Sequence, residues 1–422
     1  MNDPAKKIPA TPLAVGLQVD ASLNRRTADV RQLQIALTPT ALATNQLQFS
    51  GQVDFSKTNA IQGNLKIAAG SLDLTRYYDL FVGGTNAAAK TAAAPAPANA
   101  GREPPAVSLP LRNFTVAADI GKLYLHEMAI SNFVTTTEID GGHIVLKPCQ
   151  LVLNGAPVSA TADVDLGVPG YKYSVSFNAQ GIPLAPLVDT FEPARAGQMD
   201  GALTADAQIN GAGITGASLK KNLAGTFNLG MTNLNLSVIN VHSTILKSVI
   251  NDVATIPELL SNPASAIASL FGGTGGHGSL MDQLQQAPIK VISVKARAGG
   301  GRVDLQSSTV QSSAFEADAT GTITLDPMLT NSVINIPVTV SLSQAIAKQL
   351  NVTSTTASGN ATYVPLPQFL TLTGTVGNPK ANIDKLALTG VVIHSVGGSL
   401  LNPSKTNSSP VGNLLNQLLR FK

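Results

Sequence analysis

The sequence predicts a mainly β protein: an elongated, curved antiparallel sheet with an open groove, built from repeated strand-turn-strand units with a few amphipathic helices. Three observations predict this fold. Apolar and polar residues alternate in several segments, the same order of strands and turns recurs along the chain, and the 44% hydrophobic content comes mostly from Ala, Val, Leu and Ile, with no Trp.

The clearest alternation lies in FEADATGTITLD, residues 315–326, and INIPVTVSL, residues 334–342. Each segment places its apolar residues on one side of a strand and its polar residues on the other, as in a sheet with one face in water. Pro337 argues against a fully paired central strand. Either each repeat closes as a sandwich over its own core, or the apolar faces line a trough that lipid fills.

We expect the trough, because Ala317, Ala319 and Gly321 leave space above the sheet that a dry core would fill with larger side chains. The predicted lipid groove therefore takes the apolar residues of four strand segments. They are Leu65, Ile67, Val175, Phe177, Phe315, Ala317, Ala319, Ile323, Leu325, Ile334, Ile336, Val338, Val340 and Leu342.

The chain is predicted to contain six segments. These are a β repeat unit (1–82), an Ala/Pro/Gly linker (83–106), a β region (107–240), a helical insertion with a Gly-rich loop (241–290), a second β repeat region (291–390) and a tail with an amphipathic helix (391–422).

Two of the repeats align with a constant offset. Leu72, Leu74, Asp79 and Phe81 each precede a similar or identical residue, Ile182, Leu184, Asp189 and Phe191, by 110 positions. Each copy reads as strand, turn, strand and short amphipathic segment, and the stretch from Gly321 repeats this order more loosely.

An amphipathic helix is also predicted at the carboxy-terminal end, where we expect it to cap the groove or to contact a membrane interface. Ser409 and Pro410 supply a cap and a first-turn residue. The apolar stripe of this helix consists of Val411, Leu414, Leu415, Leu418 and Leu419.

No pattern in the sequence indicates an enzyme. GTGGHG, residues 273–278, has the spacing of a dinucleotide-binding loop but follows a helix-like segment, so we interpret it as a flexible loop. The five histidines lack metal-ligand spacing, and the single cysteine, Cys149, excludes an internal disulfide. We predict no catalytic residue, metal or cofactor. With 13% charged residues and a net charge of +3, the chain also lacks the basic field that nucleic-acid binding requires.

Three pieces together resemble the carboxy-terminal region of AsmA-family envelope proteins: FTVAADIGKLYLHEMAISNF, GGHIVLKPCQLVLNGAPVSATADVDL and MDGALTADAQINGAGITGASLKKNLAGTFNL. The likeness extends over roughly residues 45–240 and more weakly to 390. The resemblance implies a periplasmic β structure in Gram-negative bacteria, anchored in the inner membrane by an amino-terminal helix. It also implies a link to outer-membrane assembly and to bridge-like lipid transfer, and supplies no catalytic residues.

From this resemblance we expect a non-enzymatic protein of the periplasm or cell envelope. It would bind or conduct phospholipid or another acyl-chain lipid between the inner and outer membranes and support outer-membrane biogenesis, with inner- or outer-membrane proteins as partners. The alternative is a scaffold that targets outer-membrane proteins through open sheet edges. The family's amino-terminal anchor is absent from this chain, so we expect a fragment or a misplaced start.

Overall fold

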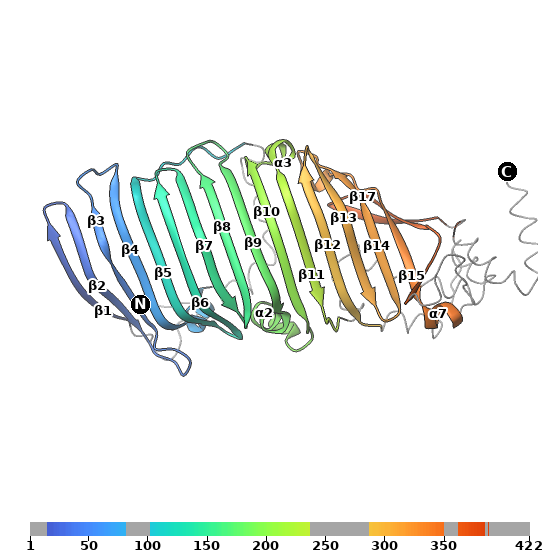
Figure 1. Ribbon diagram of the computed structural model, residues 1–422, viewed down its shortest axis with the longest axis horizontal. Helices are drawn as coiled ribbons and strands as arrows, with labels where there is room; N and C mark the ends of the chain where they lie inside the picture. The colour runs from blue at the N-terminus through green and yellow to red at the C-terminus, as the bar shows by residue number, and fades with distance from the viewer. Residues whose placement is uncertain (1–14, 82–101, 237–286, 350–361, 385–386, 388–422) are drawn as a thin grey trace, which may run out of the picture. The chain divides into compact units, whose positions relative to one another are not determined.

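The computed structural model describes five parts of the chain, which are mainly β (Figure 1): residues 15–81, 102–236, 287–349, 362–384 and 387. The chain divides into two compact units. Unit 1 comprises residues 1–231, 296–303 and 325–328, and unit 2 comprises residues 232–295, 304–324 and 329–422. The predicted fold class is confirmed, because the strands form an open, curved sheet with few helices.

Ten strands of unit 1 are paired in the order of the chain. They are β1 (Val15–Asn24), β2 (Thr27–Leu37), β3 (Gln46–Asp54), β4 (Ile61–Asp73), β5 (Leu111–Leu125), β6 (Met128–Asp140), β7 (His143–Leu153), β8 (Ala156–Asp165), β9 (Lys172–Pro183) and β10 (Ala202–Ala212). Three more strands, β11 (Ala224–Thr232), β12 (Ile289–Gly299) and β13 (Arg302–Ser312), follow along the chain.

Local sequence explains where these strands turn and bulge. Asn154 and Gly155 both have positive φ angles, 49° and 87°, which is the conformation of the tight turn that best matches the twist of two antiparallel strands. This turn joins β7 and β8 within the LNGAPVSA segment. Pro148 cannot donate to the ladder, and it lies where the register between β7 and β8 shifts, between Leu146 and Cys149.

One pair differs from the predicted antiparallel sheet: β4 and β5 are parallel. A parallel pair needs a long crossover connection. The chain leaves β4 through helix α1 (Thr75–Phe81) and returns along residues 102–110 to the opposite end of the strands, where the Ile61 N–H donates to the Pro110 carbonyl at 2.8 Å.

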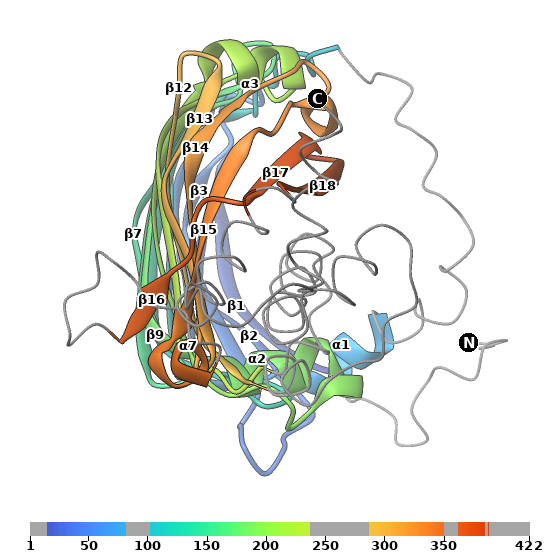
Figure 2. The ribbon, with the colours of Figure 1, turned by 90° about the vertical axis from the view of Figure 1, so that its right-hand side faces the viewer.

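The predicted order of strand, turn, strand and short amphipathic segment is found in all three repeats, and in each of them the segment is a helix. β3 and β4 lead into α1, β8 and β9 lead into α2 (Leu184–Phe191), and β14 (Phe315–Thr324) and β15 (Ile336–Ser343) lead into α7 (Gln344–Gln349). The remaining short helices are η1 (Pro193–Arg195), α3 (Gly216–Asn222) and η3 (Leu329–Asn331). In unit 1, α1 and α2 lie on the concave side of the sheet, at the same end of the strands (Figure 2).

Unit 2 is built around β15. One edge of β15 pairs with β14. The other edge pairs with two strands: residues 341–343 with β16 (Tyr363–Pro365), and residues 336–338 with β17 (Leu370–Thr375), which in turn pairs with β18 (Asn378–Ile383). Its core contains the largest fully buried side chains of the described residues, among them Phe315, Phe369, Leu342 and Leu370.

Several predicted features lie outside the described residues. These are residues 83–101 of the predicted linker, residues 241–286 of the predicted insertion with its Gly-rich loop, and the tail with its amphipathic helix. The six predicted segment boundaries stay predictions.

Candidate functional site

The candidate site is the apolar face of the unit 1 sheet. In β3 and β4 the register places Phe49 opposite Ile67 and Leu47 opposite Ala69, while Gln48 and Ser50 belong to the other face. The same apolar rows continue on both sides, because strand neighbours that are directly paired share a face. They comprise Leu33, Phe49, Ile67 and Ala118 in one row and Ile35, Leu47, Ala69 and Ile120 in the next.

The apolar face ends at β1 with side chains that are well exposed. Val15, Leu17, Val19 and Leu23 all alternate with polar residues, and their exposed fractions are between 58% and 68%. Leu17 pairs with Ile35 and Val19 with Leu33, so these residues extend the same rows. An apolar side chain in such a row is in contact with water unless another apolar molecule covers it.

A second stretch of this face lies on β8, β9 and β10. Phe177 is flanked by Ala160 and Ala207, and Val175 by Ala162 and Ile209. Val175 is 38% exposed and Phe177 is half-buried. The two predicted groove residues in β9 therefore lie 110 positions after Leu65 and Ile67 of β4 and occupy the equivalent place in the second repeat.

Helix α2 closes this face at one end of the strands. Ala156, Ala179 and Ile182 are buried there, at most 4% exposed, and Leu187 of the helix, which is half-buried, packs against them. Along β9 the apolar side chains become more accessible away from the helix, from Ala179 at 0% to Val175 at 38%. The accessible part of the face is consequently the part that α2 does not cover.

The opposite end of the strands is crossed by residues 103–110. The N–H groups of Val107 and Leu109 donate to the carbonyls of Leu166 and Gly141, at 2.8 and 3.3 Å, which lie in two different turns. We call this segment the strap. It ties the β6–β7 and β8–β9 turns to each other without adding a strand to the sheet.

Glu103 fixes one end of the strap. Its carboxylate accepts hydrogen bonds from the backbone N–H groups of Ile214 and Thr215, at 2.9 and 3.1 Å, and from the Thr215 hydroxyl. Burial raises the pKa of Glu103, but the hydrogen bonds from Ser218, Thr215 and Ile214 outweigh it and lower the pKa to about 2. Gly213, at φ 85°, leaves room for the carboxylate, since a Cβ there would lie 2.8 Å from Oε1.

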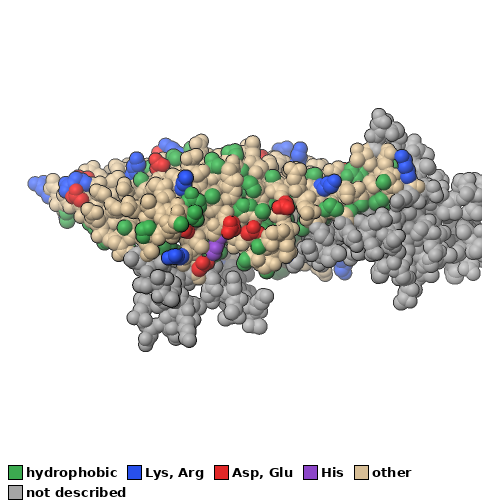
Figure 3. Space-filling model, turned by 90° about the horizontal axis from the view of Figure 1, so that it is seen from below, with side chains coloured by type: hydrophobic (Ala, Val, Ile, Leu, Met, Phe, Trp, Pro, Cys, Tyr) green, Lys and Arg blue, Asp and Glu red, His purple; other side chains and the backbone are tan. Residues whose placement is uncertain are grey.

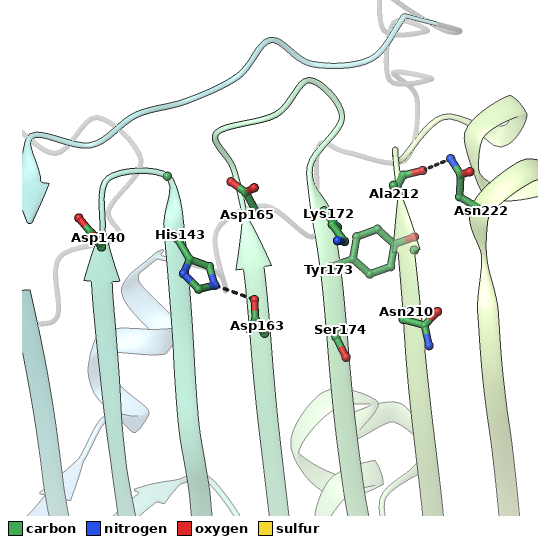
Figure 4. Close-up of a pocket in the computed structure, with 12 residues that line it drawn as sticks. Asp140, His143, Asp163, Asp165, Lys172, Tyr173, Ser174, Asn210, Ala212 and Asn222 are labelled. Carbon is green, nitrogen blue, oxygen red and sulfur yellow. Dashed lines mark hydrogen bonds and ion pairs between the residues drawn. The ribbon is translucent and has the colours of Figure 1, made fainter. Parts of the chain in front are cut away.

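A polar pocket of about 820 Å³ lies near the strap, on the ends of β7 to β10 (Figure 4). His143 of β7 points toward Asp163 of β8, with Nε2 2.8 Å from Oδ1, and both side chains are at least half exposed. Asp165 and Lys172 also line it. No group of three or more metal-ligating side chains occurs among the described residues.

The predicted groove residues of unit 2 have a different environment. Phe315 pairs with Leu342, Ala317 with Val340 and Ala319 with Val338. Except for Ala319 and Ile323, which are half-buried, all the predicted residues between 315 and 342 are at most 9% exposed, including Leu325 and Ile334, which lie outside the strands.

The structure therefore corrects the expectation of open space above Gly321. A Cβ at Gly321 would lie 3.1 Å from Cγ1 of Ile336, so the large side chain of the neighbouring strand already occupies the space next to Gly321. Alternation identified the apolar face correctly but could not tell whether protein or lipid covers it. Lipid contact at all fourteen predicted residues stays a prediction.

Charge is spread thinly over the described surface. Seen along the strands in Figure 3, Lys and Arg side chains and Asp and Glu side chains are scattered among uncharged ones, and neither sign dominates this end. This agrees with the absence of a basic field in the composition. None of the helices in the described part of the chain has the length and hydropathy of a membrane span.

Sequence reasoning missed the strap, Glu103 and the pairing of His143 with Asp163. The partners of Glu103 lie more than 110 positions away, so no local pattern links them. His143 and Asp163 belong to adjacent strands joined by the Asn154–Gly155 turn, but counting outward from this turn would place His143 three positions out of register with Asp163, on the other face. The register shift between Leu146 and Cys149 brings the two side chains to the same face, and no local pattern predicted that shift.

Comparison with known proteins identifies a family for most of this region. The family model described as the AsmA family matches residues 6–274, which is more than half of the 422 residues and includes β1 to β11. Neither the curated proteins nor the solved structures gave a match. The matched region, together with the open, curved sheet that it forms, establishes that the chain belongs to the AsmA family.

Proposed function

We propose that this protein binds acyl-chain lipids, phospholipids above all, on the apolar face of unit 1. In this role the protein would be located in the periplasm and would conduct lipid between the inner and outer membranes. AsmA membership is consistent with lipid transport or outer-membrane assembly in the cell envelope, and the family is not a known enzyme family.

One observation carries this proposal. The apolar rows of unit 1 run from strand to strand on a single face, yet their side chains keep part of their surface exposed, up to 68% in β1 and 38% in β9. Removing such surface from water is favourable by about 25 cal/mol per Å². Acyl chains supply an apolar cover that adapts to side chains of unequal size, such as Phe177 between Ala160 and Ala207.

The experiment compares two substitutions in the same strand. Val175→Asp places a carboxylate on the apolar face, and Ser176→Asp places one on the polar face next to it. We expect gently purified parent protein and Ser176→Asp to carry phospholipid that mass spectrometry detects, and Val175→Asp to carry several-fold less at unchanged folding. A parent protein without lipid, or equal lipid in both variants, would contradict the proposal.

The scaffold alternative has its own support in β1. In the described part of the chain, β1 pairs only with β2, so its other edge offers unpaired backbone groups of the kind that strand addition uses. A photo-crosslinker at Gln18 tests it. Adducts with an outer-membrane protein in cells, combined with a parent protein that carries no lipid, would favour the scaffold over lipid transport.

A further inference from the structure

Three cations lie together at the end of the β1–β4 strands that is opposite to α1. The β1–β2 turn contains Arg25 and Arg26, and the β3–β4 loop contains Lys57. The Arg26 guanidinium donates to the Ser56 carbonyl at 2.9 Å, and the Phe55 N–H donates to the Arg26 carbonyl at the same distance. These two bonds hold the turn and the loop side by side, and Figure 1 shows both at the same end of the strands. We call the β1–β2 turn and the β3–β4 loop, with their three cations, the basic rim.

The positive charges of the basic rim are only partly neutralised by other groups of the protein. Among the described residues, the Arg25 guanidinium and the Lys57 ammonium make no hydrogen bond or ion pair. Asp54 accepts the Ser56 N–H at 2.8 Å, and this hydrogen bond, together with the positive charge of Lys57, lowers the pKa of the carboxylate. Asp29 lies on the polar face of β2, opposite Ser22 and Gln52, so the three cations face two carboxylates. Positive charge therefore exceeds negative charge at this rim.

The apolar rows begin directly below the basic rim. Val53 pairs with Ala28 and Gly63, and the rows then continue through Phe49 and Leu47 on the same strand. From Val53 to Leu47 the strand advances six residues, about 20 Å. One leaflet of a bilayer has a hydrocarbon layer of roughly 15 Å, half of the full core. The apolar span is thus long enough to cover the acyl chains of one leaflet lipid.

The far end of these rows is closed. Ala69, Leu72 and Ala43 are 8%, 5% and 6% exposed, and α1 follows directly after β4. A hydrated headgroup does not fit among such residues because it would lose its water without new hydrogen bonds. The two ends of the face thus differ in chemistry, with cations at one end and buried apolar side chains at the other.

We propose that the basic rim, with the apolar rows of β2, β3 and β4, is a binding site for the phosphate headgroup and acyl chains of one anionic phospholipid. The headgroup phosphate lies against Arg25, Arg26 and Lys57, and the chains extend along the strands toward α1. This site rests on the proposed lipid-binding function and adds to it a headgroup preference and a lipid orientation.

The test uses two lipids that differ only in the phosphate-bearing headgroup. Full-length protein is incubated with vesicles of phosphatidylglycerol and diacylglycerol that carry the same acyl chains, then separated, and the ratio of the two bound lipids is measured by mass spectrometry. The variant is Arg25→Gln with Lys57→Gln. The matched control, Arg76→Gln with Lys122→Gln, removes two exposed cations at the opposite end of the strands.

We expect the parent and the control to favour phosphatidylglycerol, and the rim variant to lose roughly 10- to 30-fold of this preference, since each basic residue near anionic lipid contributes about 1 kcal/mol. The preference should also weaken at high salt. A rim variant that keeps the parent ratio would overturn the headgroup site while leaving lipid binding intact. A parent that carries neither lipid would overturn both proposals.

Two further experiments distinguish a lipid site from a site for free phosphate and test the orientation of the bound lipid. Inorganic phosphate in excess should displace less than half of the bound phosphatidylglycerol, because acyl chains hold the lipid; complete displacement would indicate a site for free phosphate. A phosphatidylglycerol with a photoreactive group at the acyl end should label the region of Leu47 and Ala69. Labelling at Val53 and Gly63 instead would reverse the orientation and contradict the site.

Discussion

Unit 1 and unit 2 use the same alternating strands but treat their apolar faces differently. In unit 1 the side chains of neighbouring strands lie in rows that stay partly exposed, as Val175 does at 38%. In unit 2, β17 pairs with part of β15, and the large side chains Phe315 and Phe369 are at most 2% exposed. The comparison teaches that strand alternation defines an apolar face, whereas the residues outside the strands decide whether the protein itself covers it.

The largest expected effect comes from a buried charge in unit 2. Ile336 is 4% exposed, so Ile336→Asp places an unpaired carboxylate in a dry core and should cost more than about 3 kcal/mol, enough to abolish the cooperative unfolding transition of unit 2. Val175→Asp in unit 1 should lower the unfolding free energy by less than about 1 kcal/mol, because water reaches this position. Thermal unfolding followed by circular dichroism measures both, and equal losses would remove the distinction between the units.

Truncating one phenylalanine in each unit gives the next largest difference. Phe369 is 2% exposed, and Phe369→Ala should cost about 3 to 5 kcal/mol through lost burial and the cavity left behind. Phe49 is half-buried, so Phe49→Ala should cost about 1 to 2 kcal/mol. Urea unfolding of lipid-free protein provides the values. A cost at Phe49 as large as that at Phe369 would mean that unit 1 has a closed core.

Glu103 contributes to the stability of unit 1 independently of the half-covered apolar face, and substituting it measures this contribution. Its folded pKa of about 2 lies below its ordinary value of 4.5, so its contribution to stability is complete above pH 4.5 and is lost as the pH falls from about 4.5 to 2. Glu103→Gln should lower the unfolding free energy by about 1 to 2 kcal/mol at pH 7. The difference from the parent should vanish near pH 2. A difference that does not change with pH would show that the charge of Glu103 is not what holds the strap.

The smallest effects come from adding one methyl group in each unit. At Gly70 of β4 a Cβ would have no neighbour within 4 Å, so Gly70→Ala should raise the unfolding free energy by about 0.4 to 1 kcal/mol by restricting the unfolded chain. At Gly321 of β14 a Cβ would lie 3.1 Å from Ile336, and Gly321→Ala should be neutral or destabilising by up to about 1 kcal/mol. Differential scanning calorimetry resolves the two signs. Stabilisation at both positions would mean that unit 2 has space to spare above Gly321.

Local pattern was sufficient for the strands, the repeated order and the short helices α1, α2 and α7, because each depends on residues close together in the chain. It also placed Leu65, Ile67, Val175 and Phe177 on the apolar face. Local pattern could not predict the parallel pairing of β4 with β5 or the filling of the space at Gly321 by Ile336, since both depend on contacts between distant segments. The same limit hid the partners of Glu103.

The parallel pair has a consequence for how such a chain can grow. Five strands separate α1 from α2, and in a purely antiparallel sheet an odd number of strands would put these helices at opposite ends. The parallel pairing of β4 with β5 restores the direction, so α1 and α2 lie at the same end of the strands, whereas the pair that follows α2, β9 with β10, is antiparallel. A copy that keeps the parallel pair is a translated version of the preceding one and not an inverted one. A gene duplication of about 110 codons could therefore lengthen the protein in one step, with every new copy presenting its apolar face and its helix in the same orientation as before.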